Sequence, residues 1–186
     1  MDNQAKAMPV TLVAVSLSLC LLHANRVLAD GPLPAPELLK IKSPNGKYFA
    51  VLDPAKKETA VFAQTGKDGK EHLLWKMPGW FRDARVADDG EHLVIGYDGI
   101  NLIPLNYQAD QVMVTLIDRG KTVKSITLKQ IIGDFKHLQK TVSHYNWGTI
   151  SGIDKKDQFT VETVEGRKIV YDAATLNVIS DSTKTP

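Results

Sequence analysis

The side chains that could do chemistry in this chain are scattered rather than gathered into metal-binding motifs. The four histidines that follow the first 29 residues show no HxH or HxxxH spacing, so a zinc site is not expected. They are His72, His92, His137 and His144. The acidic loops 68–71 and 154–157 carry lysines where a calcium loop needs oxygen ligands, which favours structural turns. We therefore predict no metal ion and no other cofactor.

Nucleophilic chemistry also lacks a sequence signature. The chain contains no GxSxG, P-loop or GxGxxG motif. Ser143 and His144 are adjacent, and on a strand their side chains would point to opposite faces, so a structural histidine is the expectation. The carboxylates Asp83, Asp88 and Asp98 would form a catalytic site only if the fold brought them together. A hydrolase built in this way stays open as the alternative function.

Aromatic side chains in a predicted loop are the first candidates for binding. The segment 78–83 reads Pro-Gly-Trp-Phe-Arg-Asp and places Trp80, Phe81 and Arg82 between two predicted strands. Exposed loop aromatics often contact ligands. Large aromatics are usually buried, so the alternative is that Trp80 or Phe81 plugs the edge of a sheet.

Two further segments add candidates to such a surface. The connection 99–110 is more apolar than a solvated loop should be. It either covers the core or presents an exposed apolar surface for binding that includes Tyr107. The segment 144–148 reads His-Tyr-Asn-Trp-Gly and offers His144 and Trp147, although a strand interior explains Trp147 equally well.

Short apolar stretches alternate with turn residues from Leu38 onward, which is typical of an all-β domain. Residues 48–52, 93–95 and 112–117 are apolar on both faces and should be covered from both sides. Residues 158–164 alternate, so the C-terminal hairpin should show one face to water. Turn residues predict five hairpins, which pair 38–42 with 47–53, 59–64 with 72–77, 85–87 with 92–97, 112–117 with 122–126, and 158–164 with 167–172.

One short helix is predicted near residues 128–138. Thr127 can cap the first turn while the side chain of Gln130 reaches back, and Ile126 and Ile131 sit at the positions of a hydrophobic staple. The predicted fold is thus all-β and mostly antiparallel, with stacked sheets of hairpins in a sandwich or partial-propeller-like arrangement and this one helix.

Two segments align at a spacing of 44 residues, namely 43–51 (Ser-Pro-Asn-Gly-Lys-Tyr-Phe-Ala-Val) and 87–95 (Ala-Asp-Asp-Gly-Glu-His-Leu-Val-Ile). Both resemble the strand-turn-strand unit of WD40-like and YVTN-like β-propellers, and 170–175 resembles the strand ending of such blades. A third copy at the same spacing would lie near residue 132, where the capped helix is predicted instead. Because a closed propeller needs at least four blades of about 40 residues, stacked sheets are the simpler expectation. Residues 88–131 also resemble small exported bacterial proteins of unknown function.

The N-terminal 29 residues have the pattern of a signal peptide. An apolar run from Val10 to Leu22 is followed by Val27-Leu28-Ala29, with cleavage expected after Ala29. The run is shorter than the roughly 20 residues of a membrane span, so no span is expected after cleavage. The predicted organisation is a signal peptide (1–29), a proline-rich tether (30–37), a single β domain (38–181) and a C-terminal tail (182–186).

Composition narrows the function classes that fit. The chain has 23 basic and 21 acidic residues and a net charge of +2, which argues against a nucleic-acid partner. Cleavage would remove Cys20, the only cysteine, and a disulfide-free exported domain favours a bacterial periplasmic or secreted protein. The leading hypothesis is a non-catalytic binding or protein-interaction module of the bacterial envelope, with an unknown protein or small ligand as its partner.

Overall fold

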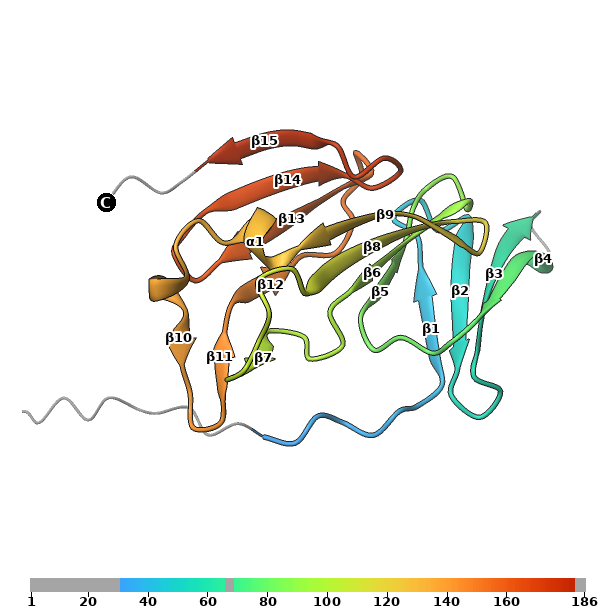
Figure 1. The fold of residues 1–186 in the computed structure, drawn as a ribbon. Coiled ribbons are helices and arrows are strands. Elements are labelled where there is room, and N and C mark those ends of the chain that lie inside the picture. Colours follow the sequence, from blue (N-terminus) through green and yellow to red (C-terminus); the bar gives the residue numbers. More distant parts are fainter. Residues whose placement is uncertain (1–30, 66–68, 183–186) are drawn as a thin grey trace, which may run out of the picture.

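The computed structural model describes residues 31–65 and 69–182, which form antiparallel strands joined by turns (Figure 1). The predicted signal peptide, its cleavage site and residues 183–186 of the predicted tail lie outside the described residues. Three sheets have four strands each and one small sheet has three. Within the described ranges, no helix has the length and apolar character that crossing a membrane would need.

The four-stranded sheets follow one another along the chain, and β7, which belongs to the small sheet, interrupts the middle one. The first sheet contains β1 (Leu39–Lys42), β2 (Tyr48–Asp53), β3 (Glu58–Thr65) and β4 (Lys70–Pro78). The middle sheet contains β5 (Ala84–Val86), β6 (His92–Gly96), β8 (Val112–Asp118) and β9 (Lys121–Thr127). The third sheet contains β12 (Gly148–Ile150), β13 (Gln158–Thr163), β14 (Lys168–Asp172) and β15 (Val178–Ser182). Neighbouring strands are antiparallel throughout, which confirms the predicted fold class.

The small sheet interrupts this pattern. It contains β10 (Gln139–Lys140), β11 (His144–Asn146) and β7 (Leu102–Pro104), in that order. Strand β7 lies inside the predicted connection 99–110, and Ile103 is fully buried, so this segment does help to cover the core. Ile100 and Leu105 in the same segment remain exposed.

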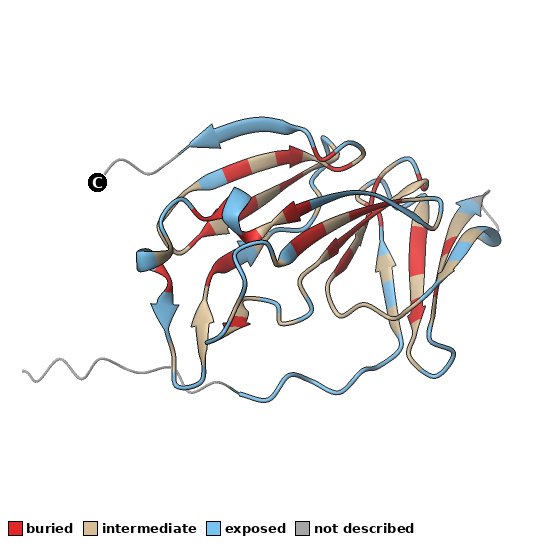
Figure 2. Ribbon diagram, viewed as in Figure 1, coloured by how far each residue is buried: buried red, intermediate tan, exposed pale blue. Residues whose placement is uncertain are grey.

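The middle sheet has an apolar face on each side and separates two hydrophobic clusters (Figure 2). Leu93 and Ile95 pack toward the first sheet, against Ala50 and Val61. Val94, between them in the sequence, packs in the other cluster, together with residues of the third sheet such as Phe159 and Ile169. The two-sided cover predicted for 93–95 is therefore confirmed. On 112–117, Met113, Val114 and Leu116 pack in one cluster and Ile117 in the other, whereas Val112 is exposed.

The outermost faces of the stack differ in how they are covered. On the first sheet, Phe49 points away from the middle sheet but is buried beneath the ring of Phe62, 5.1 Å away between centroids, and the ammonium of Lys40. On the third sheet, β13 alternates between buried and half-buried residues, so one face of the C-terminal hairpin meets water as predicted.

Both copies of the predicted turn repeat are present, and the turn 154–157 is closed in the same way. A hydrogen bond to its first residue closes each turn, from Gly46 N to Ser43 O at 3.0 Å, from Gly90 N to Ala87 O at 3.3 Å and from Asp157 N to Asp154 O at 3.0 Å. The three donor residues have φ values of +69°, +71° and +60°. Aspartate tolerates positive φ better than most residues, so Asp157 can take the place of glycine. Helix α1 (Leu128–Ile131) occupies the region near residue 132, so no copy follows there at the 44-residue spacing, as expected.

The helical region is short and lies where the sequence predicts it. Helix α1 (Leu128–Ile131) is followed by a 3₁₀ turn η1 (Phe135–His137). The side-chain oxygen of Gln130 accepts hydrogen bonds from the backbone N–H of Thr127 at 2.7 Å and from its hydroxyl at 3.0 Å. The predicted contact of the Gln130 side chain with Thr127 is therefore present.

A substitution at Gly148 tests how closely β12 packs on β13. Its φ is +146°, and a Cβ atom there would lie 2.2 Å from the carbonyl oxygen of Glu162. We expect Gly148→Ala to lower the free energy of unfolding by about 3 kcal/mol, because backbone and methyl group cannot both be accommodated. Denaturant melts would measure this loss. Gly152→Ala is the matched control, since a Cβ there meets nothing within 4 Å, and an equal loss in both variants would contradict the explanation.

Candidate functional site

The loop 79–83 between β4 and β5 holds the predicted binding residues Trp80, Phe81 and Arg82. The Gly79 N–H donates to Lys57 O at 2.7 Å, which ties the start of the loop to the β2–β3 turn. Trp80 and Phe81 are half-buried and pack against the cluster between the first and middle sheets. The alternative that these rings only plug a sheet edge is thus partly right, because each ring has a buried side and an open side.

Trp80 and Arg82 both donate hydrogen bonds to the backbone of the N-terminal segment. The indole Nε1 of Trp80 donates to the carbonyl oxygen of Glu37 at 2.9 Å. A guanidinium nitrogen of Arg82 donates to the carbonyl oxygen of Pro34. We call these two side chains the Trp80–Arg82 pair.

The guanidinium of Arg82 is itself held in place. It lies 5.2 Å from the centre of the Trp80 ring, within the range of a cation–π contact. Its Nε atom is 3.7 Å from a carboxylate oxygen of Asp98, whose side chain is largely exposed. Only 14% of the Arg82 side chain is exposed, so the charge is desolvated on most sides and has a fixed direction.

Residues 31–38 form an extended strap on the surface, which is the blue segment along the bottom of Figure 1. It forms neither strand nor helix, as expected for the proline-rich tether, and every residue in it is exposed. The strap runs from the region of β11 to the start of β1 (Figure 1). It is attached to the domain at Pro34 and Glu37 rather than hanging free.

A surface pocket of about 500 Å³ adjoins the N-terminal end of the strap. Gly31, Pro32 and Leu33 line one side, while Gly99, Leu102, Ser143 and His144 line the other. His144 is half-buried at the start of β11. The strap, the Trp80–Arg82 pair and this pocket together form one continuous surface.

The structure separates the other predicted binding residues from this surface. Tyr107 stacks on Phe135 with ring centroids 5.7 Å apart and meets the edge of Tyr145 at the same distance. Trp147 is fully buried, and its indole N–H donates to Ile100 O at 2.8 Å. Trp147 is therefore a core residue, although it lies between β11 and β12 and not inside a strand.

Ser143 and His144 interact although their adjacency argued against it. The Ser143 hydroxyl lies 2.9 Å from Nδ1 of His144, because Ser143 belongs to the bend before β11 and not to the strand. The expectation of opposite faces was wrong for this reason. The three carboxylates of the hydrolase alternative bind different partners, Asp83 with Arg85, Asp88 with Asn45 and Asp98 with Arg82.

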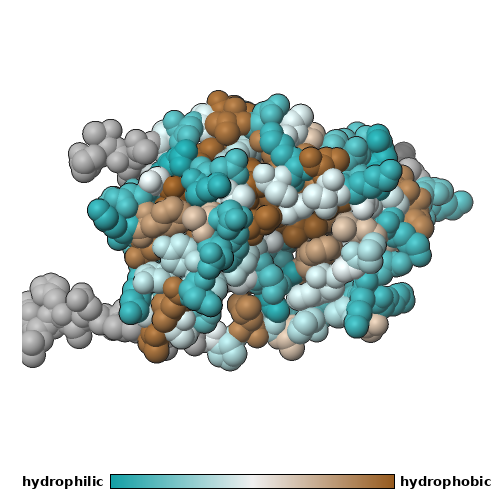
Figure 3. All heavy atoms as spheres, in the orientation of Figure 1, coloured by the Kyte–Doolittle hydropathy of each residue, from teal (hydrophilic) through white to brown (hydrophobic). Residues whose placement is uncertain are grey.

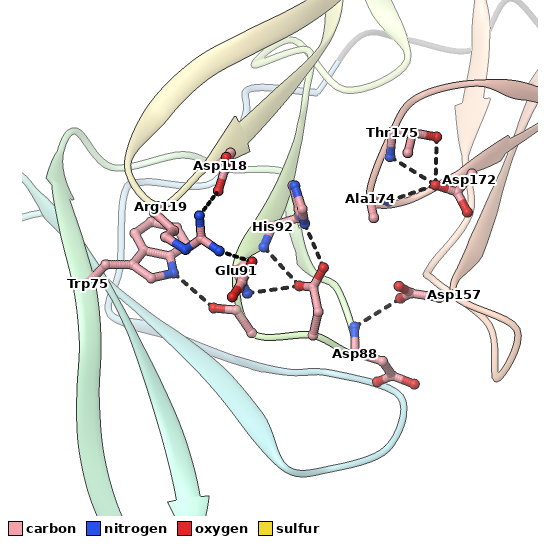
Figure 4. A network of polar contacts seen from close by, with 12 residues as sticks. Trp75, Asp88, Glu91, His92, Asp118, Arg119, Asp157, Asp172, Ala174 and Thr175 are labelled. Atoms are coloured by element: carbon pink, nitrogen blue, oxygen red, sulfur yellow. Dashed lines mark hydrogen bonds and ion pairs between the residues drawn. The ribbon is translucent and has the colours of Figure 1, made fainter.

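A second polar cluster lies where the turns of the middle and third sheets meet (Figure 4). Asp157 accepts a hydrogen bond from the Asp88 N–H at 2.9 Å. Burial raises the pKa of Asp157, and the neighbouring carboxylates of Asp88, Asp89 and Asp172 raise it further. In the described part of the chain, no group of three or more metal-ligating side chains is placed to hold an ion. The hydrogen bond from Asp88 to Asp157 therefore connects a turn of the middle sheet to a turn of the third sheet.

Figure 3 shows one face of the molecule, coloured by hydropathy. Hydrophobic side chains appear there as separate patches among hydrophilic ones (Figure 3). The sequence pointed to Trp80 and Arg82 as binding residues, but it did not show that they bind the strap. It suggested Asp98 only as a catalytic carboxylate and not as a partner of Arg82. The alternating prolines of residues 32–36 were the available signal.

Comparison with known proteins adds little beyond the fold. No family model matches the chain, and no curated protein matches it in sequence. Hydrazine synthase from Kuenenia stuttgartiensis is 14% identical, with a TM-score of 0.37 over 78% of this chain and 36% of that one. A putative 6-phosphogluconolactonase from Bacteroides uniformis is 14% identical, with a TM-score of 0.37 over 84% of this chain and 45% of that one. The C-terminal WD40 domain of Sif2 is 11% identical, with a TM-score of 0.33 over 81% and 40%. The chain spans less than half the length of each of these structures, and its resemblance to propeller-type proteins is weak.

Because Trp80 is half-buried, we expect removal of its ring to cause an intermediate loss of stability. We expect Trp80→Ala to lower the free energy of unfolding by about 2 kcal/mol, less than the roughly 3–5 kcal/mol of a fully buried aromatic. Trp147→Ala is the matched control, because Trp147 is 0% exposed and should show the full loss. Urea melts of both variants make the comparison. Equal losses would mean that the Trp80 ring belongs to the core and presents no open side.

Asp157 predicts a pH-dependent stability effect. Because its pKa in the folded state is raised, the folded protein binds this proton more tightly than the unfolded chain, and stability falls as pH rises above the ordinary aspartate range. Asp157→Asn keeps an acceptor oxygen and tolerates the positive φ. We expect it to raise the unfolding temperature at pH 7, with a gain that shrinks as the pH is lowered toward 3.

Asp181 supplies the opposite control. Its pKa is lowered by hydrogen bonds from Arg167, at 2.9 Å and 2.6 Å, so its charge stabilises the folded state at neutral pH. Asp181→Asn should lower the unfolding temperature at pH 7, and this loss should fade as the pH falls through the lowered pKa. The same sign of change in both variants would refute the electrostatic explanation.

Proposed function

We propose that this protein is an exported, non-catalytic binding module of the bacterial envelope, which binds an extended polypeptide at the Trp80–Arg82 pair. One observation carries the proposal, namely that both side chains donate hydrogen bonds to main-chain carbonyl groups of an extended segment. Main-chain recognition of this kind suits a peptide or protein partner. The half-buried Trp80 and the desolvated Arg82 also have the composition typical of energetically dominant residues in interfaces.

The weak resemblance to propeller blades is compatible with an interaction role. We infer that the three meanders are an incomplete, propeller-like stack, because consecutive four-stranded sheets pack face to face in chain order. In such a stack the loops between sheets are held rigidly by the strands. The loop 79–83 is a connection of this type, which favours binding through pre-positioned side chains.

The hydrolase alternative requires Asp83, Asp88 and Asp98 to come together in the fold. The contact between Ser143 and His144 beside the pocket is a separate observation in favour of a hydrolase. Nucleophilic catalysis needs a base that is oriented by a third group and donors for an oxyanion. Asp83, Asp88 and Asp98 bind three different partners, so they do not supply that arrangement together. The binding function is therefore the better supported of the two.

Site-specific cross-linking in cells tests the proposed function. A photoreactive residue in place of Ile100, which is exposed next to the pocket residue Gly99, should trap one envelope polypeptide in the producing bacterium. Trp80→Phe combined with Arg82→Met should remove that product, because the indole and guanidinium donors are gone. The same photoreactive residue in place of the exposed Val178 on β15 is the control and should not trap it.

Two results would contradict the proposal. One is a set of cross-links from position 100 that the double variant leaves unchanged. The other is hydrolysis of ester or peptide substrates by the purified protein that Ser143→Ala abolishes, which would establish the hydrolase instead.

A further inference from the structure

The strap has a backbone that is restricted before it binds anything. Each residue from 31 to 36 is either a proline or directly precedes one, in the order Gly-Pro-Leu-Pro-Ala-Pro. Proline fixes φ near −65°, and a residue before proline is driven toward the β or polyproline II region. The segment therefore loses little conformational entropy when it is held in an extended form.

The polar groups of the strap and the Trp80–Arg82 pair are complementary. Pro32, Pro34 and Pro36 have no N–H group, so this part of the backbone offers mainly acceptors. An indole nitrogen and a guanidinium group can only donate. A side chain that also accepts hydrogen bonds would find no proline N–H group to pair with its acceptor. Trp80 and Arg82 have only donors, so neither side chain carries an acceptor that the strap leaves unpaired.

The spacing of the two bound carbonyl groups also fits one backbone conformation. Arg82 binds the carbonyl of Pro34, and Trp80 binds that of Glu37, three residues later. A polyproline II helix has three residues per turn, so carbonyl groups three residues apart point to the same side. Binding of proline-rich segments on aromatic surfaces is a recurrent mode of peptide recognition.

From these observations we propose that the Trp80–Arg82 pair is a recognition site for proline-rich segments, and that a proline-rich segment of a second polypeptide binds there in place of the strap. This inference rests on the proposed function and names its ligand class. The strap is then the resident ligand of the site, and it shows which peptide chemistry the site accepts.

The strap is built to be exchanged rather than to hold the fold. All eight residues from 31 to 38 are exposed, so its release uncovers little of the core. As an attached segment it competes at an effective concentration on the order of millimolar, as expected for a short tether. A partner segment must therefore compete with the attached strap. Only a segment with enough affinity or at a high enough concentration will bind in its place.

Binding of a synthetic peptide to the purified exported protein tests the inference. A fluorescent peptide with the sequence of residues 31–38 is titrated against the wild type and against a variant with Pro32, Pro34 and Pro36 all replaced by glycine. The glycine strap is less restricted and competes less well, so we expect roughly tenfold tighter peptide binding by the variant than by the wild type. Fluorescence anisotropy gives both dissociation constants.

Further variants in the glycine-strap background locate the bound peptide. Trp80→Phe and Arg82→Met should each weaken binding about tenfold, the size expected for one lost hydrogen bond to an indole or guanidinium donor. Trp75→Phe is the matched control, because it also removes an indole–carbonyl hydrogen bond, from Trp75 to Gly90 O at 2.8 Å, at a different place. It should leave the peptide affinity unchanged.

A second peptide, with its three prolines replaced by alanine, keeps the carbonyl groups but frees the backbone. It should bind about tenfold more weakly. Equal affinity for the two peptides would overturn the inference, as would the absence of binding to a glycine-strap variant that melts like the wild type. If cross-links from position 100 still depend on Trp80 and Arg82 in that case, the proposed function stands and only the proline-rich ligand class is wrong.

Discussion

The whole structure depends on the need to cover a sheet that is apolar on both faces. Leu93, Val94 and Ile95 are consecutive buried residues on β6, and alternate side chains of a strand point to opposite faces. No single layer can bury all three. The first sheet covers one face and the third sheet covers the other, so the middle sheet can be stable only as part of a three-sheet stack.

The same constraint places the candidate site. Because β5 and β6 are antiparallel, with Ala84 opposite Ile95, the loop before β5 and the loop after β6 lie at one end of the middle sheet. Arg82 comes from the first of these loops and Asp98 from the second, which explains how they meet. The turns that connect β5 to β6 lie at the opposite end, with the carboxylate cluster. The stack thus places the proposed binding surface and the carboxylate cluster at opposite ends of the middle sheet.

The sequence predicted the elements whose signals are local and missed those that depend on distant partners. The hairpins closed by glycine turns were predicted because the turn residues and the apolar strands on either side of them lie within about 15 residues of one another in the sequence. Strands such as β7 and β10 have three and two residues and show no period to detect. Residues 154–157 were predicted as a structural turn, but their likeness to the glycine turns was missed because Asp157 takes the place of glycine. For the site, Trp80 and Arg82 could be selected by type, but their contacts with Glu37 and Pro34 span 43 and 48 residues and follow only from the fold.

The proline-rich strap also resolves a problem that the fold creates at β1. This strand is at the edge of the first sheet, and an unpaired edge invites pairing with the strand of another molecule. Pro32, Pro34 and Pro36, in the strap that precedes β1, lack the N–H groups that strand pairing there would need, and Lys40 and Lys42 add exposed charges along the edge. The chain therefore blocks association by strand pairing at the point where it offers carbonyl groups to Trp80 and Arg82. Under the proposed recognition, the same segment discourages strand pairing and supplies the extended backbone that Trp80 and Arg82 bind.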